Sequence, residues 1–499
     1  MNVLKGLEPA SVFRFFEEIC GIPHGSGDTK RISDYCVQFA KERGLEYRQD
    51  EFNNVIIRKQ GTSGYENAAP VMLQGHIDMV CEKEAGCDID FAKDGLRLRL
   101  ENGIVTADGT TLGGDDGIAA AYMLAILDSE TIPHPPLECV FTVDEEIGML
   151  GAAAMDMSDL RSRIMLNIDS EDEGFLLVSC AGGMTARCIL PVERTGAGKG
   201  AGDAAGARTV VKVTGCMGGH SGTEIDKGRA NASMVLGEVL EALRKEVPFR
   251  LVSVNGGLKD NAIPREAAAE LVFADDAGAA EKIAAMSAAL QKRFAEADPE
   301  LRVVYTAETG SGADSCAAGT EAAVSAPMTE ESTARVIRAL RSMPNGVRKM
   351  SADIEGLVQT SLNLGIMKTE ESQVSFAFSV RSSVEEEKQA LRKELEKVTS
   401  DLGGTVEVQG EYPAWEYRKE SPLRDLMVEV FTEQYGKAPV VQAIHAGVEC
   451  GLFSGQLPGL DCVSFGPDMK DIHTPKESMD VESVRRTWDY LLEILRRLK

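Results

Sequence analysis

Apolar and polar positions follow two periods along the chain, one typical of helices and one typical of buried strands. Apolar residues recur at helical spacing over residues 9–20 and 29–43, and the run VMLQGHID (71–78) has the character of a buried strand. GGDDG then opens IAAAYMLAILDS, which predicts a helix that begins at Asp115 or Asp116. Because helical and strand-like segments follow one another in turn, the sequence predicts an α/β fold.

Two further apolar runs resemble VMLQGHID in ending on acidic residues. They are LECVFTV (137–143), followed by DEE, and RIMLNID (163–169). In open α/β sheets, ligands bind beyond the carboxyl ends of the strands. One edge of the predicted sheet would therefore collect the polar residues at these ends and in the turns just after them: His76, Asp78, Asp115, Glu145, Glu146 and Asp169.

The pattern changes after about residue 190. The segment RTGAGKGAGDAAGA (194–207) is rich in glycine and alanine and lacks apolar periodicity, which predicts a flexible loop. Strand-like and helical segments resume over 208–385, whereas chemistry-bearing motifs return only in HAGVECG (445–451) and GPDMKDIHTPKES (466–478). We therefore expect a catalytic domain built from residues 1–190 and 390–499, interrupted by an inserted α+β lid or dimerisation domain at 208–385.

Composition narrows the class of protein. A chain of 499 residues is long enough for two or three domains, and 43% hydrophobic with 26% charged residues is typical of a soluble protein. The formal net charge of −26 disfavours a broad nucleic-acid or anionic-membrane contact, because both require a positive surface. The start lacks a signal-peptide pattern and no run approaches the ~18 apolar residues of a membrane span, so we expect a cytoplasmic protein.

The cysteines and histidines differ in what they indicate. Eleven cysteines without CxxC spacing predict neither a disulfide framework nor a thiolate zinc site. Histidine is scarce, which makes the context of each one informative. The six histidines are His24, His76, His134, His220, His445 and His473, and the contexts of His24 and His134 suggest no role.

The acidic run Asp144, Glu145 and Glu146 raises an electrostatic question. Neighbouring carboxylates repel one another, so such a run is ordinarily a solvated loop unless a cation or a shared proton relieves the repulsion. Singly, His76 would more often be a core histidine and Asp115 a helix cap. Together, a histidine and carboxylates on several strand ends are the ligands that zinc or a harder divalent ion requires. One glutamate of the pair could then bind metal while its neighbour stays free as a base.

Eight motifs in order carry a resemblance to a known family. They are GHIDMV, GTTLGGDDGIA, TVDEEIGMLGA, NIDSED, GCMGGHSG, NAIPRE, HAGVECG and GPDMKDIHTP. Along essentially the whole chain they resemble the aminoacyl-histidine dipeptidases, the Xaa-His dipeptidase branch of the di-zinc metallopeptidases that also contains carnosinases and aminoacylases. The resemblance implies a mixed, largely parallel sheet flanked by helices, cleavage of dipeptides including β-Ala-His, and a homodimer.

The same resemblance implies two Zn²⁺ ions per subunit, with Mn²⁺ or Co²⁺ as possible substitutes. His76 and Asp169 would bind one ion, Glu146 and His473 would bind the other, and Asp115 would bridge them. Asp115 is preferred to Asp116 because relatives keep an acid at the first position and vary at the second.

Two further residues receive roles by resemblance. Asp78 would orient the imidazole of His76 through its other nitrogen. Glu145 would be the general base, taking a proton from the attacking water and returning one to the leaving amine.

Substrate contacts are also implied by the resemblance. His220 would stabilise the oxyanion, in its own active site or in that of the partner subunit, and the fork of Arg381 suits a terminal carboxylate. Residues expected to line the substrate site are His220, Asn261, Arg381, Gly447 and Glu449, and the role of His445 stays open.

Other activities use the same ligand set. Aminoacylases, carboxypeptidases, tripeptide aminopeptidases and desuccinylases hydrolyse amides with it, so amide hydrolysis is better supported than dipeptide specificity. A non-catalytic metal-dependent binding protein would need Glu146 alone, whereas here Glu145 stands beside it. Phosphoesterase chemistry is disfavoured because no Arg/Lys-rich phosphate cradle lies near the ligand motifs.

Overall fold

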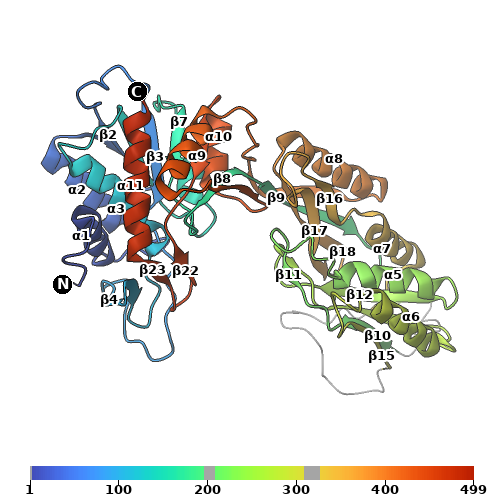
Figure 1. Cartoon of the computed structure of the whole chain (residues 1–499). Helices are drawn as coiled ribbons and strands as arrows, with labels where there is room; N and C mark the ends of the chain where they lie inside the picture. The colour runs from blue at the N-terminus through green and yellow to red at the C-terminus, as the bar shows by residue number, and fades with distance from the viewer. Residues whose placement is uncertain (1–2, 196–207, 308–325) are drawn as a thin grey trace. The chain divides into compact units, whose positions relative to one another are not determined.

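A computed structural model describes residues 3–195, 208–307 and 326–499 (Figure 1). The chain forms two compact units: unit 1 comprises Met1–Cys180 and Ala414–Lys499, and unit 2 comprises Ala181–Pro413. The predicted flexible loop 194–207 lies, apart from its first two residues, outside the described residues. Within the described ranges, no helix has the length and apolar character needed to cross a membrane.

Unit 1 is a mixed α/β structure. Its helices are α1 (Ala10–Cys20), α2 (Lys30–Arg43), α3 (Gly114–Asp128), α4 (Leu150–Ala154), α9 (Pro422–Tyr435), α10 (Glu449–Gln456) and α11 (Val481–Arg497). The strands of its main sheet are β1 (Glu46–Gln49), β2 (Val55–Lys59), β3 (Val71–His76), β6 (Leu137–Thr142), β7 (Ile164–Asn167), β8 (Phe175–Cys180), β20 (Val440–Ile444) and β21 (Asp461–Ser464). A smaller antiparallel sheet contains β4 (Leu98–Glu101), β5 (Ile104–Ala107), β22 (Met469–Lys470) and β23 (Ser478–Asp480).

The main sheet of unit 1 has a parallel centre. Its strand order is β1-β2-β6-β3-β7-β21-β8-β20, and β6, β3, β7 and β21 all run in the same direction. Strands β1 and β2 add antiparallel pairs at one side. The carboxyl ends of the four central strands therefore meet at one edge, as the sequence pattern predicts.

Helices cover both faces of this sheet. Successive side chains of a strand point to opposite faces, so Gly75 and Gln74 in β3 face different layers. A Cβ built on Gly75 would lie 2.6 Å from Cβ of Ala119, which places α3 against that face. Glu449 of α10 bonds to Gln74 on the other face. Helix α3 is buried along nearly its whole length, which explains the run of apolar residues from Ile118 to Leu127.

Unit 2 is built on an antiparallel sheet with strand order β15-β10-β14-β12-β17-β18-β9-β19, and β16 pairs with β17. These strands are β9 (Gly182–Pro191), β10 (Arg208–Thr214), β12 (Phe249–Gly256), β14 (Ala267–Phe273), β15 (Arg302–Ala307), β16 (Gly346–Met350), β17 (Val358–Thr369), β18 (Gln373–Ser382) and β19 (Thr405–Tyr412). A separate pair joins β11 (Gly219–His220) to β13 (Ala262–Ile263). The helices are α5 (Ala232–Arg244), α6 (Ala279–Arg293), α7 (Glu330–Ser342) and α8 (Glu385–Asp401).

The boundaries of the two units differ from the predicted ones. The predicted catalytic segments 1–190 and 390–499 include β9, most of α8 and all of β19, which belong to unit 2. Strand β9 pairs along its length with β18 and also with β19, and α8 packs on these strands. Local apolar patterns identify a strand but not its pairing partner, so they could not show which sheet β9 joins.

The start of one helix differs from the prediction as well. Helix α3 begins at Gly114, but Asp115 and Asp116 have non-helical backbone angles inside it. In unit 2, helix α5 begins at Ala232. Its N-cap is Asn231, whose side chain accepts hydrogen bonds from the first helical N–H groups.

Candidate functional site

The parallel centre of unit 1 gathers the strand-end residues predicted from the sequence. His76 ends β3, Asp169 lies two residues after β7, and Glu145 lies three residues after β6. Two other segments approach the same edge. The start of α3 carries Asp115, and the connection between β22 and β23 carries His473.

Asp115 lies between two imidazoles. Its Oδ1 is 3.1 Å from Nε2 of His76, and its Oδ2 is 3.1 Å from Nε2 of His473. Oε1 of Glu146 is 2.9 Å from the same nitrogen of His473. A carboxylate whose two oxygens face different imidazoles has the arrangement needed to bridge two cations.

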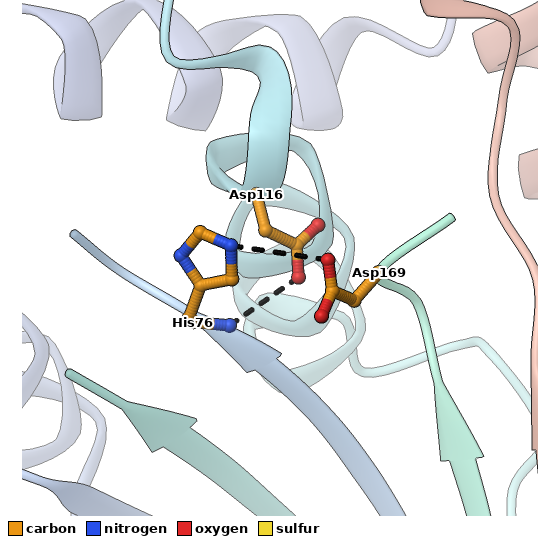
Figure 2. A group of neighbouring side chains, drawn as sticks. All are labelled: His76, Asp116 and Asp169. Atoms are coloured by element: carbon orange, nitrogen blue, oxygen red, sulfur yellow. Dashed lines mark hydrogen bonds and ion pairs between the residues drawn. The ribbon is translucent and has the colours of Figure 1, made fainter. Parts of the chain in front are cut away.

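Asp116 and Asp169 also lie close to His76 (Figure 2). Oδ1 of Asp169 is 3.8 Å from Nε2 of His76, and the backbone N–H of His76 donates to Oδ2 of Asp116 at 3.3 Å. Two sets of three residues could each hold a metal ion, because within each set the potential ligand atoms all lie within 4.8 Å of one another. One set is His76 with Asp116 and Asp169, and the other is His76 with Asp115 and Glu146. Asp115 and Asp116 thus fall in different sets.

The charges of this cluster suit a divalent cation. Burial opposes protonation of His76, but Asp115 and Asp78 outweigh it and raise its pKa well above the usual value. Asp115 and Glu146 raise the pKa of His473 to about 10. Burial raises the pKa of Asp169 well above its ordinary range. More carboxylates are gathered than two imidazoles can balance, and imidazole nitrogen with carboxylate oxygen is a donor set that zinc accepts.

The cluster is open to solvent on one side of unit 1. The side chain of His473 is 45% exposed, whereas that of His76 is 1% exposed. The cluster therefore meets solvent at His473 and not at the buried strand end.

Asp78 connects His76 to Glu145. Nδ1 of His76 lies 3.0 Å from the backbone carbonyl oxygen of Asp78 and 3.4 Å from its Oδ1. The same Oδ1 accepts a hydrogen bond from the backbone N–H of Glu145 at 3.1 Å, and Oδ2 accepts one from Ser26 at 2.8 Å. Asp78 is therefore placed to fix both the imidazole and the chain that carries Glu145.

The turn after β6 separates the three neighbouring acids. Asp144 has a left-handed backbone, with φ of 56°, and its Oδ1 accepts a hydrogen bond from the N–H of Gly27 at 2.7 Å. Glu146 turns to His473, while burial raises the pKa of Glu145 to about 7. Asp144 is thus a locally hydrogen-bonded acid, and the two glutamates occupy different surroundings.

Polar residues predicted to contact substrate gather on unit 2. His220 in β11 pairs with Ala262 in β13, and the carbonyl of Asn261 accepts a hydrogen bond from Ser221 at 2.8 Å. Arg381 of β18 is buried and donates to the hydroxyl of Tyr412 at 3.2 Å. Burial, followed by the charge of Arg381, lowers the pKa of His220.

Glu449, which is expected to line the substrate site, is fully buried. Its Oε2 accepts hydrogen bonds from Gln74 and Thr142, each at 2.6 Å. Burial raises its pKa to about 8, and the charge of Glu145 adds to this shift. The two hydrogen bonds tie α10 to the sheet. Gly447 lies between β20 and α10, and His445 belongs to neither set of potential ligands in the described residues.

Sequence reasoning missed two residues that support the site. Ser26 bonds to Asp78, and the buried Glu477 bonds to the backbone at the start of α3. Their only signals were a serine between glycines in HGSG and a glutamate four residues after His473. Neither signal reveals a partner that is distant in the sequence.

Comparison with known proteins places the whole chain in one group. The profile of Peptidase family M20/M25/M40 matches residues 72–497. The chain is 36% identical over 506 aligned positions to the cytosol non-specific dipeptidase of Escherichia coli (strain K12), covering 100% of this chain and 99% of that protein.

Solved structures agree with this result. Aminoacylhistidine dipeptidase from Vibrio alginolyticus matches with a TM-score of 0.88 and 35% identity, covering 99% of this chain and 97% of that one. The aminopeptidase PepT of Bacillus cereus, at 15% identity and a TM-score of 0.55 over 99% of both chains, shares the fold. The full-length matches in sequence and in fold agree with the profile, and the chain therefore belongs to peptidase family M20/M25/M40.

Proposed function

We propose that this protein is a metal-dependent dipeptidase. The observation that carries the proposal is the carboxylate of Asp115, which faces His76 with one oxygen and His473 with the other at 3.1 Å each. Glu145 lies beside this cluster without being one of the residues in either set of potential ligands. Full-length similarity to two dipeptidases supports the same reaction.

The proposed ligands divide into two sets that share Asp115. His76 and Asp169 would hold one Zn²⁺, and Glu146 and His473 would hold the other, with Mn²⁺ or Co²⁺ as substitutes. Bound at this edge, such ions would lower the pKa of water and polarise a substrate carbonyl.

The protein's own residues then handle the protons. Glu145 takes a proton from the attacking water as the new C–O bond forms, and it returns a proton to the amine as the C–N bond breaks. Asp78 holds Nδ1 of His76, which leaves Nε2 directed at Asp115. The hydrogen bond from the backbone N–H of Glu145 to the carboxylate of Asp78 fixes the position of the base relative to the imidazole.

Unit 2 would supply groups for the anionic parts of the substrate. Arg381 is a buried cation with one side-chain nitrogen, Nε, that has no hydrogen-bond partner in the described residues. A guanidinium fork suits a terminal carboxylate. We propose that His220 stabilises the oxyanion and that Asn261 and Gly447 contact the substrate backbone.

The range of dipeptides is the finer part of the proposal. One relative is named as non-specific and the other as acting on aminoacylhistidine, so substrate breadth differs between similar proteins. We propose activity on dipeptides that includes Xaa-His and β-Ala-His. We also propose a cytoplasmic homodimer, which light scattering coupled to size-exclusion chromatography would test.

The deciding experiment measures metal content and amino-acid release on the same preparation. Gly-His, β-Ala-His and a dipeptide without histidine are compared with N-acetyl amino acids and tripeptides, each with Zn²⁺, Mn²⁺ or Co²⁺ added to metal-free protein. The proposal expects metal-dependent release from dipeptides. Faster cleavage of N-acetyl amino acids or tripeptides would indicate an aminoacylase or a tripeptidase, and bound metal with no hydrolysis would indicate a binding protein.

A further inference from the structure

Glu477 is a buried carboxylate that is hydrogen-bonded to the backbone at the start of helix α3. It lies four residues after His473, and 2% of its surface is exposed. Its oxygens accept hydrogen bonds from four consecutive backbone N–H groups. The donors are Leu112 at 2.7 Å and Gly113 at 3.2 Å to Oε2, and Gly114 at 2.8 Å and Asp115 at 3.4 Å to Oε1.

The local backbone explains why a distant carboxylate is needed here. The first N–H groups of a helix have no partner within the helix, and an anion at that end is also favoured by the helix dipole. The N-cap residue, Gly113, provides no side-chain bond. Asp115 and Asp116 depart from helical angles, so the first turn is irregular and depends on outside partners.

The two glycines before Asp115 make room for this contact. Gly113 has a φ of 66°, in the left-handed region where glycine is favoured. A Cβ on Gly114 would lie 3.3 Å from Oε1 of Glu477 and 3.0 Å from Sδ of Met469. The two glycines of GGDD therefore leave space for the carboxylate of Glu477 to contact the backbone.

This contact joins two segments that each carry a proposed ligand. His473 and Glu477 both lie on the connection between β22 and β23. Asp115 lies at the start of α3, where its backbone N–H donates to Glu477. Nε2 of His473 and Oδ2 of Asp115 are 3.1 Å apart. We propose that Glu477 is a positioning residue that holds Asp115 between the two imidazoles, an inference that rests on the ligand roles proposed above.

The test compares Glu477→Gln with the wild type and with a matched control. Glutamine has the shape of glutamate but no charge. Its NH₂ group is a donor, so it cannot accept the hydrogen bonds that the backbone N–H groups give to the second carboxylate oxygen. Calorimetric titration of metal-free Glu477→Gln with Zn²⁺ should show a Zn²⁺ affinity about 10- to 100-fold below that of the wild type. In the metal-loaded variant, kcat should change by a larger factor than KM. Glu477→Asp, which keeps the charge on a shorter stem, should fall between the two and serves if Glu477→Gln does not fold.

The control is Asp461→Asn. Asp461 is another buried carboxylate at a helix start, accepting hydrogen bonds from Ser421 at 2.6 Å and from the N–H of Leu423 at 3.0 Å at α9. It should lose thermal stability while keeping metal affinity. Unchanged metal affinity and kcat in Glu477→Gln, or an equal loss of affinity in Asp461→Asn, would overturn the positioning role alone. A wild type that binds no metal would overturn the ligand assignment as well.

Discussion

Unit 1 and unit 2 carry their candidate functional residues on different kinds of sheet. In unit 1 four parallel strands end at one edge, which brings together His76, Glu145 and Asp169 although they are far apart in the sequence. In unit 2 the sheet is antiparallel, so neighbouring strands end on opposite edges. His220 there comes from a two-residue strand outside the main sheet. Strand-end motifs therefore locate a site well in the first unit and poorly in the second.

The two groups also differ in charge. The cluster in unit 1 is rich in carboxylates, which favour protonation of His76 and His473 and suit a cation. In unit 2 burial and then the charge of Arg381 lower the pKa of His220, and Arg381 is itself a buried cation, which suits an anion. We expect substitutions of the proposed metal ligands in unit 1 to change metal content, and substitutions in unit 2 to leave metal content unchanged.

The largest effect is expected from Asp115→Ala. Both imidazoles lose the carboxylate between them, so both metals should be lost and hydrolysis should fall to background. Asp116→Ala provides the comparison, because the hydrogen bond that Asp116 accepts from His76 comes from the backbone N–H and not from the imidazole. Elemental analysis of both variants after metal loading shows which of the two aspartates is the shared metal ligand. Loss of both metals in Asp116→Ala, with Asp115→Ala unaffected, would reverse the assignment.

The next effect concerns one metal of the pair. His473→Ala removes the imidazole shared by Asp115 and Glu146, so one metal per subunit should remain and turnover should fall strongly. His445→Ala is the control and should keep two metals. Two metals in His473→Ala, with one lost in His445→Ala, would move the ligand to the end of β20.

A smaller effect is expected in unit 2. Arg381→Ala should raise KM and lower kcat/KM about 10- to 100-fold, because a charged hydrogen bond contributes about 1.5–3 kcal/mol. Arg187→Ala, on the neighbouring strand β9, is the matched control, since Arg187 is partly exposed beside Glu370 and Glu407. Metal content should not change in either variant. Metal loss in Arg381→Ala would break the division between the units.

The last of these effects is on stability rather than on the reaction, and it involves pH and Glu449. Its pKa is raised from 4.5 to about 8 in the folded protein. Between these values the folded state keeps a proton that the unfolded state has released, so the free energy of unfolding falls as pH rises, by up to about 1.4 kcal/mol per pH unit. Glu449→Gln cannot titrate, so its dependence should be shallower. Urea unfolding of metal-free protein from pH 5 to 8 measures this, and identical slopes would contradict it.

Much of unit 1 was predictable because apolar runs mark strands and parallel strands share an edge. The runs ending at His76 and before Asp144 are strands, and their polar ends meet as expected. The apolar pattern alone could not separate Asp115 from Asp116, since their difference lies in an irregular helix start, and the preference for Asp115 came from the family resemblance. Glu477 was missed because its partners are more than 360 residues away in the sequence. The burial of Glu449 depends on Gln74 and Thr142, which its own motif does not show.

The division of roles between Glu145 and Glu146 is the central claim. Metal content and turnover of Glu145→Gln, measured beside Glu146→Gln, test it most directly. Glu145→Gln should hold two metals per subunit while kcat falls about 10²- to 10⁴-fold, because a base is removed and no ligand is. Glu146→Gln should lose one metal. Near wild-type turnover in Glu145→Gln, or metal loss there with full occupancy in Glu146→Gln, would contradict the account.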